Sequence, residues 1–147
     1  MNASYAKVNH YRNNHYEGMG SEQLILLLYN GALTRFRLAR EGIEENNVKK
    51  LGENLSKAIA IIAELNTSLD PTTNDESIQF LRGLYRAILV ELPKASATKD
   101  ITIITRAEKY ISELKNIWVN HVMAEKGSSI KDPQKENQRS HMSSFSV

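Results

Sequence analysis

The chain has 147 residues, of which 41% are hydrophobic and 24% charged, and it contains no cysteine. This length and composition predict one globular domain, and the missing cysteine excludes disulfides, thiolate catalysis and cysteine-based zinc sites. The 19 basic and 17 acidic residues leave a formal net charge of +2, which is too balanced to indicate binding to a polyanion. We therefore expect no nucleic-acid partner.

No stretch of the sequence has the length and apolarity of a membrane span. The longest apolar run extends from Leu24 to Tyr29, whereas a bilayer span needs about 20 residues. The first residues also lack the apolar region of a secretory signal. We therefore expect a cytoplasmic protein that does not insert into a membrane.

Residues 1–19 are predicted to form an irregular N-terminal arm. They show no sustained periodicity and hold several asparagines, which favour turns over helix interiors. Yet Tyr5, Tyr11 and Tyr16 give the arm large side chains that suit a surface half apolar and half wet. We expect the arm to dock on the domain, and we predict that these three tyrosines contact a partner.

Two long amphipathic helices are predicted to follow the arm. The first begins at Gly20 or Ser21 and ends near residues 46–47, and the second runs over about residues 48–69. The dipeptide Asp70-Pro71 then stops the second helix, because proline disfavours a helical residue before it.

Two further helices are predicted after that stop. A T-x-x-E capping box at residues 73–76 opens the third helix. This helix should end or kink near Leu92, because Pro93 lacks an N–H donor and clashes with the preceding turn. The fourth helix starts near Asp100 and carries a single broad apolar stripe that includes Trp118.

Four helices joined by short connections predict an all-α fold, an antiparallel up-down four-helix bundle. The bundle should occupy residues 20–126, and the polar, unperiodic residues 127–147 should form a disordered tail. The largest apolar side chains of the core-facing stripes are the expected core anchors. They are Leu28, Phe36, Ile62, Tyr85, Leu114 and Trp118.

Two of the helices carry a second apolar stripe, lying roughly 110° to 120° around the helix from the core stripe. Gly31 lies within the stripe of the first helix, and mid-helix glycine usually marks a close approach by another backbone. The stripes suggest a groove for a helical or extended segment of a partner, although such residues can also be partly buried against neighbouring helices. The predicted partner-binding residues of the helices are Leu24, Leu27, Gly31, Ile61, Phe80 and Leu84.

The sequence offers no minimum set of residues for catalysis or for a metal. The four histidines form no i, i+4 pair and no carboxylate–histidine motif, and there is no glycine-rich phosphate loop. We expect no enzyme, no catalytic residue, no metal and no cofactor. The arginines near residues 35–40 alternate with glutamates, which predicts a solvated face with i, i+4 pairs such as Arg37 with Glu41 and Arg40 with Glu44.

A known family shares the opening of the first helix. The run from Ser21 to Ala32, SEQLILLLYNGA, resembles the S/T-P-x-x-L-x-x-x-L-Y-D/N-G-A opening of the flagellar secretion chaperone FliS. The likeness continues through Leu84-Tyr85 and ends at Glu113-Leu114 with Trp118, where that family has a closing E-L-x-x-x-W. The resemblance covers about residues 11–118.

This resemblance implies a cytoplasmic bacterial export chaperone built as a four-helix bundle. Members of the family bind the C-terminal segment of flagellin in hydrophobic grooves, prevent its premature polymerisation and deliver it to a component of the flagellar type III export gate. An N-terminal arm lies over part of the same surface in that family. Two alternatives stay open, a non-chaperone helical adaptor or regulator-binding module and an RNA-binding helical protein.

Overall fold

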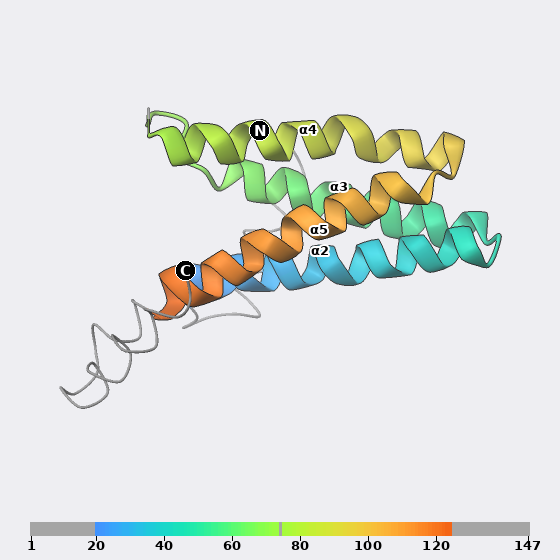
Figure 1. Ribbon diagram of the computed structural model, residues 1–147, viewed down its shortest axis with the longest axis horizontal. Coiled ribbons are helices and arrows are strands. Elements are labelled where there is room, and N and C mark those ends of the chain that lie inside the picture. The colour runs from blue at the N-terminus through green and yellow to red at the C-terminus, as the bar shows by residue number, and fades with distance from the viewer. Residues whose placement is uncertain (1–19, 74, 125–147) are drawn as a thin grey trace.

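A computed structural model describes residues 20–73 and 75–124, which form four α-helices followed by a short π-helix. The α-helices are α2 (Ser21–Glu44), α3 (Val48–Thr67), α4 (Glu76–Thr98) and α5 (Ile101–Ile117), and the π-helix η1 covers Trp118–Met123. Short connections reverse the chain after α2, α3 and α4 and produce the predicted antiparallel four-helix bundle (Figure 1). The predicted arm at 1–19 and tail at 127–147 lie outside the described residues.

Three of the four helices begin at a side-chain cap. Asn47, Asp75 and Asp100 accept hydrogen bonds from the backbone N–H groups of the first turns of α3, α4 and α5. The predicted capping box at residues 73–76 is therefore wrong by two residues. Thr73 instead accepts a bond from the N–H of Asp75, and this bond orients the residue that caps the helix.

Helix α4 does not end at Pro93 but continues to Thr98, so the expected end of the helix near Leu92 is wrong, while the alternative of a kink there stays a prediction. The residues on both sides of the proline explain the difference, because Leu92 and Ala95 are fully buried in the core. The proline ring itself lies on the exposed side of the helix. Burial of the flanking residues thus outweighs the local cost of a proline within a helix.

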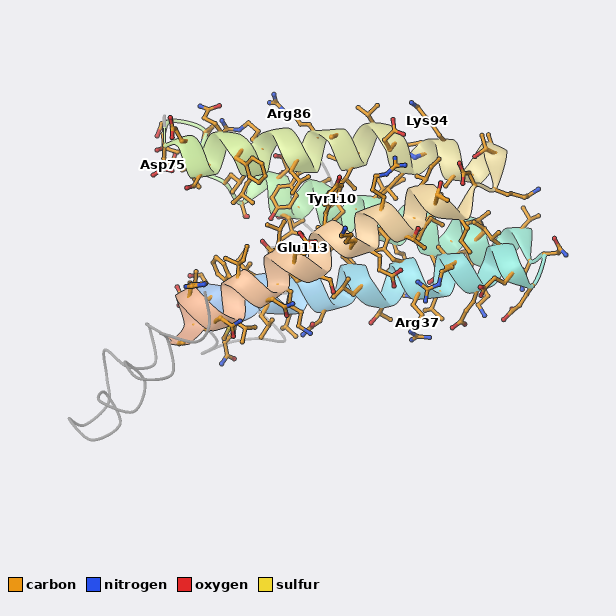
Figure 2. The ribbon with its side chains drawn as sticks, viewed as in Figure 1. Arg37, Asp75, Arg86, Lys94, Tyr110 and Glu113 are labelled. Atoms are coloured by element: carbon orange, nitrogen blue, oxygen red, sulfur yellow. The ribbon has the colours of Figure 1, made fainter. Side chains whose placement is uncertain are left out.

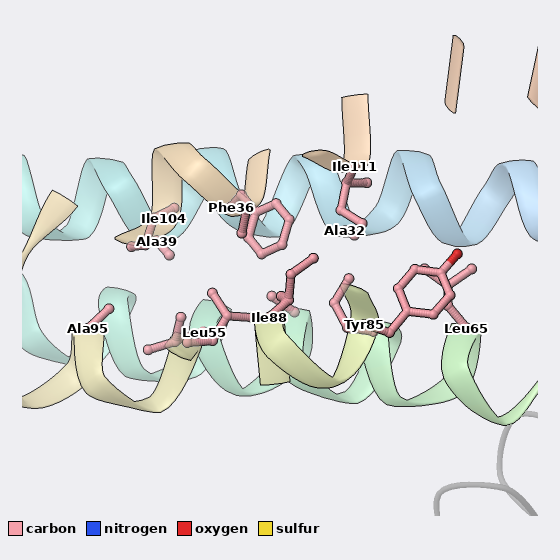
Figure 3. Close-up of a cluster of buried hydrophobic side chains, with 14 of the residues drawn as sticks. Ala32, Phe36, Ala39, Leu55, Leu65, Tyr85, Ile88, Ala95, Ile104 and Ile111 are labelled. Atoms are coloured by element: carbon pink, nitrogen blue, oxygen red, sulfur yellow. The ribbon is translucent and has the colours of Figure 1, made fainter. Parts of the chain in front are cut away.

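Sixteen buried apolar residues from all four helices fill the space between them (Figure 3). Phe36, Ile62 and Tyr85 are buried as predicted. The expected anchors Leu28 and Leu114 and the large Trp118 are only partly buried, and they lie against the edge of this core. The core prediction is therefore confirmed for Phe36, Ile62 and Tyr85, whereas Leu28, Leu114 and Trp118 are less buried than predicted.

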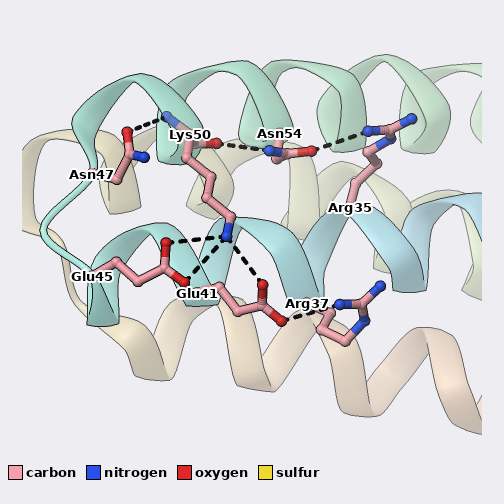
Figure 4. A network of polar contacts seen from close by, with 7 residues as sticks. All are labelled: Arg35, Arg37, Glu41, Glu45, Asn47, Lys50 and Asn54. Carbon is pink, nitrogen blue, oxygen red and sulfur yellow. Dashed lines mark hydrogen bonds and ion pairs between the residues drawn. The ribbon is translucent and has the colours of Figure 1, made fainter.

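A polar network fastens α2 to α3 beside their connection (Figure 4). The Lys50 ammonium donates to carboxylates of Glu41 and Glu45, both at 3.1 Å, and Glu41 also accepts from Arg37 at 3.0 Å. Hydrogen bonds from Lys50 and Arg37 lower the pKa of Glu41, and those to Glu45 and Glu41 raise the pKa of Lys50.

The predicted Arg37–Glu41 pair is confirmed by this network, but the predicted Arg40–Glu44 pair is not formed. Arg40 pairs instead with Glu108 of α5. The two side chains are partly buried between the helices, where a partner on the neighbouring helix is closer than solvent-facing Glu44. The expected mixed-charge face is thus partly a helix–helix contact.

Helix α5 does not run alongside α4 over its whole length. It leaves the end of α4 and crosses toward the start of α2, so the distance between α4 and α5 grows along the bundle (Figure 1). The contact of Trp118 with the first turn of α2 completes this crossing, since its indole N–H donates to the Glu22 carbonyl at 2.8 Å. The sides of α4 and α5 that face each other therefore separate toward the start of α4 (Figure 1).

Candidate functional site

The first candidate site is a groove between α4 and α5, which we call the α4–α5 groove. It has a volume of about 240 Å³ and a largely apolar bed, with one arginine and one glutamate among its lining residues. Figure 2 shows Tyr110 lying between the two helices. The groove is lined by Leu84, Ala87, Ile88, Glu91, Leu92, Ile103, Arg106, Ala107 and Tyr110.

The second apolar stripe of α4 forms one wall of this groove. Leu84 and Ala87 lie on it, and Phe80 is one turn earlier on the same face. Phe80 is 66% exposed, and Ile117, seven residues beyond Tyr110 on α5, is 54% exposed. The apolar surface therefore extends from the groove toward the region where α4 and α5 have separated.

The second candidate site is a larger cavity at the end of the bundle, which we call the end cavity. It has a volume of about 510 Å³ and lies among the start of α2, the end of α3, the start of α4 and the first residue of η1. Its lining is mostly apolar and also includes hydroxyl groups and two carboxylate residues, of which Glu64 is buried. The lining residues are Ser21, Ile25, Tyr29, Glu64, Leu65, Thr67, Ser68, Leu69, Asp70, Ile78, Leu81, Tyr85 and Trp118.

Three aromatic side chains meet in the wall of the end cavity. The hydroxyl oxygens of Tyr29 and Tyr85 are 2.8 Å apart and share a hydrogen bond between α2 and α4. The ring of Trp118 meets that of Tyr29 edge to face, with ring centroids 6.4 Å apart and an interplanar angle of 75°. Burial raises the pKa of both tyrosines, so their phenols stay protonated at neutral pH.

A turn at the rim holds the connection from α3 to α4 in place. The carboxylate of Asp70 accepts from the N–H of Thr72 at 2.9 Å and from its hydroxyl at 2.7 Å, and these bonds lower the pKa of Asp70. Arg82 of α4 donates to the Asp70 carbonyl at 3.0 Å. These contacts give the carboxylate a structural role at the edge of the cavity.

The structure places the predicted partner-binding residues in three different surroundings. Leu84 lines the α4–α5 groove and Phe80 lies beside it, whereas none of the predicted residues that the structure describes lines the end cavity. Gly31 lies against Ile61, whose Cδ1 would be 3.3 Å from a Cβ at position 31, so these two residues face one another between α2 and α3. Tyr5, Tyr11 and Tyr16 lie outside the described residues.

The two remaining predicted residues lie on α2. Leu24 is partly buried, and Leu27 is 38% exposed on the outer side of the helix. Their role in partner binding stays a prediction, as it does for the rest of the set. The described group that a Cβ at position 31 would meet is the end of the Ile61 side chain and not another backbone.

Sequence reasoning missed the α5 side of the groove and the whole end cavity. The single broad apolar stripe predicted for the fourth helix also includes Ile103 and Tyr110, but in the structure both line the groove and Tyr110 is 38% exposed. The sequence did contain an indication of the α5 side of the groove, because the apolar stripe of α5 is wider than one neighbouring helix can cover. No signal in the sequence placed Tyr29, Tyr85 and Trp118 together.

Within residues 20–73 and 75–124, no three histidine, aspartate or glutamate side chains are grouped as metal ligands would be. No helix in this part of the chain combines the length and the apolarity of a membrane span.

The fold and the two sites define an all-α bundle with apolar depressions on its surface. Comparison with protein families gives a match to the family described as "Flagellar protein FliS" over residues 2–126. The chain therefore belongs to the FliS family.

Individual relatives are similar over most of the chain. The flagellar secretion chaperone FliS of Bacillus subtilis (strain 168) is 32% identical over 104 residues, covering 71% of this chain and 77% of the relative. The protein with the same description from Escherichia coli (strain K12) is 31% identical over 113 residues, covering 76% and 82%. That of Salmonella typhimurium (strain LT2) is 34% identical over 97 residues, covering 65% and 72%.

Proposed function

We propose that this protein is a cytoplasmic export chaperone for flagellin. It binds the C-terminal segment of flagellin, prevents premature polymerisation and delivers the subunit to a component of the flagellar export gate. Membership of the FliS family supports the chaperone role, since the relatives are described as flagellar secretion chaperones. The observation that carries flagellin binding is the α4–α5 groove with its extension past Phe80.

The dimensions and chemistry of the groove suit an amphipathic helix. The α4 face that runs from Glu91 along the groove and beyond it to Phe80 extends for about 16 Å, which corresponds to three helical turns. Apolar residues at i, i+3 or i+4 and i+7 of a bound helix would cover Leu84 and Ala87, and polar residues would face solvent. Arg106 and Glu91 at the groove give such a helix charged neighbours on both sides.

Replacing Phe80 with aspartate tests the groove directly. Because Phe80 is mostly exposed, we expect Phe80→Asp to change the free energy of unfolding little. Binding to a synthetic peptide of the flagellin C-terminus from the same bacterium should weaken by about thirtyfold or more, the effect of losing an interface anchor of about 2 kcal/mol. Isothermal titration calorimetry and urea unfolding measure the two quantities.

Val90 provides a matched control on the same helix. It is 63% exposed, close to the value for Phe80, but it does not line the groove. Val90→Asp should leave peptide binding unchanged. Equal losses from both variants, or no loss from Phe80→Asp, would remove the groove from flagellin binding, and failure of the unmodified protein to bind the peptide would contradict the proposed function itself.

A further inference from the structure

The hydroxyl pair of Tyr29 and Tyr85 leaves one proton without an acceptor. A neutral phenol carries one O–H donor, so the two hydroxyls hold two protons, and the hydrogen bond between them uses one. Neither hydroxyl bonds to any other side chain or backbone group among the described residues. The second proton is therefore available to a group that enters the end cavity.

Because both tyrosines are buried, the free energy of the protein depends on whether this second donor has an acceptor. Tyr29 is 3% exposed and Tyr85 is 1% exposed, and both line the cavity. A buried donor without an acceptor costs free energy, while a donor that meets an acceptor from a bound molecule stabilises the complex. Among the described residues no group accepts this bond, and the cavity is large enough to hold several water molecules that could do so.

The remaining wall of the cavity is suited to an apolar side chain. Ile25, Leu69, Ile78 and Leu81 line it, and the single indole N–H of the wall is already bonded to the Glu22 carbonyl. A bound segment thus meets apolar surface on several sides, the buried side chain of Glu64 and one O–H donor. A polypeptide segment that is not helical at this point can supply both matching groups, an apolar side chain and an unpaired main-chain carbonyl.

We propose that the end cavity receives an apolar side chain of the flagellin segment, and that the Tyr29–Tyr85 hydroxyl pair donates a hydrogen bond to a main-chain carbonyl beside that side chain. This inference rests on the proposed function and assigns a second contact region for the same partner. The tyrosine pair acts as a recognition element, since it favours a segment that presents an acceptor at this depth over one that presents only apolar atoms.

Phenylalanine variants of the two tyrosines separate this role from a structural one. In Tyr29→Phe or Tyr85→Phe the remaining hydroxyl still carries its proton, and that proton is now free to reach the guest. We expect each single variant to bind the flagellin peptide within about twofold of the unmodified chain. The double variant has no donor, and its affinity should fall roughly fivefold to tenfold.

Thr34→Val together with Ser112→Ala is the matched control, because it removes two exposed hydroxyls from positions outside both sites. This variant should bind as the unmodified chain does. Unchanged affinity in the double phenylalanine variant would overturn the inference, and so would single variants that lose as much as the double. Tighter binding in the double variant would also overturn it, because the carbonyl would then belong to the protein's own N-terminal arm.

A second variant tests the cavity even if the double phenylalanine protein fails to fold. Ser21 is an exposed residue at the cavity wall, so Ser21→Phe adds bulk there without removing a core contact. It should weaken peptide binding by at least about tenfold with an unchanged melting temperature. Normal binding by this variant would show that the peptide does not enter the cavity, whereas no binding by the unmodified chain would contradict the proposed function instead.

Discussion

Gly42 lies where the end of α2 and the backbone of α3 approach each other closely. A Cβ at this position would lie 2.6 Å from the backbone nitrogen of Leu51 and 2.9 Å from its Cα. Because backbone atoms cannot move aside as a flexible side chain can, we expect Gly42→Ala to destabilise the protein by roughly 1 to 3 kcal/mol. Urea unfolding monitored by circular dichroism provides the free energy of unfolding.

Two other helical glycines are the controls for this prediction. A Cβ at Gly52 or Gly83 meets nothing within 4 Å. Alanine at either position should therefore stabilise the protein by up to about 1 kcal/mol, the difference in helix propensity. A stable Gly42→Ala variant would show that the two helices can separate without cost.

The buried tyrosine pair predicts how stability depends on alkaline pH. Burial raises the pKa of Tyr29 and of Tyr85 above the ordinary value of 10.0, so the folded protein retains protons that the unfolded chain releases. Their contribution to stability is complete below about pH 10 and is lost as the pH rises further. Urea unfolding at several pH values should show a decline that is smaller in the Tyr29→Phe/Tyr85→Phe double variant. Equal declines would contradict the assignment.

Pro93 lies inside helix α4 and lowers the stability of that helix. Pro93 cannot donate a backbone hydrogen bond, yet the helix continues for five residues to Thr98. Pro93→Ala restores the donor, and we expect it to stabilise the protein by about 1 to 3 kcal/mol, less the added freedom of the unfolded chain. Thermal unfolding measures the change.

Pro71 is the control because it lies outside the helices, in the connection from α3 to α4. Replacing it with alanine should bring no gain, since proline restricts the unfolded chain without removing a helical bond there. A gain of similar size from both replacements would mean that the position of Pro93 within α4 is unimportant.

The elements that sequence reasoning predicted well are those whose signals are local. Apolar residues at i, i+3 and i+4 identified all four α-helices, and Asp70-Pro71 correctly marked the stop after α3. Local signals failed at Pro93, where packing of Leu92 and Ala95 extends the helix. They also missed η1, because its six residues carry the same apolar spacing as a continuing α-helix.

The candidate sites were harder to predict from the sequence, because they depend on which helices are neighbours. The second stripe of α4 was visible, and Leu84 does line a groove. Periodicity identifies a face of one helix, however, and not the helix that lies opposite. The divergence of α5 from α4 and the meeting of Tyr29 with Tyr85 follow from packing across the whole bundle.

We expect the N-terminal arm to cover part of the surface that binds the partner. If residues 5–19 cover part of the partner surface, a partner must displace them and binds with an affinity reduced by the fraction of open molecules. Deleting residues 1–16 should then tighten binding of the flagellin peptide. Weaker binding would instead indicate that Tyr11 or Tyr16 contacts the partner, and equal affinities would exclude the arm from recognition.

The hydrogen bond from Trp118 to the Glu22 carbonyl joins residues 96 positions apart and so closes a ring that contains all four α-helices. Contacts between consecutive helices can form before this ring closes, because they join positions much nearer in sequence. Trp118 is also the only tryptophan of the chain. Its emission during refolding therefore reports the moment when the beginning and the end of the bundle meet, rather than the formation of the helices.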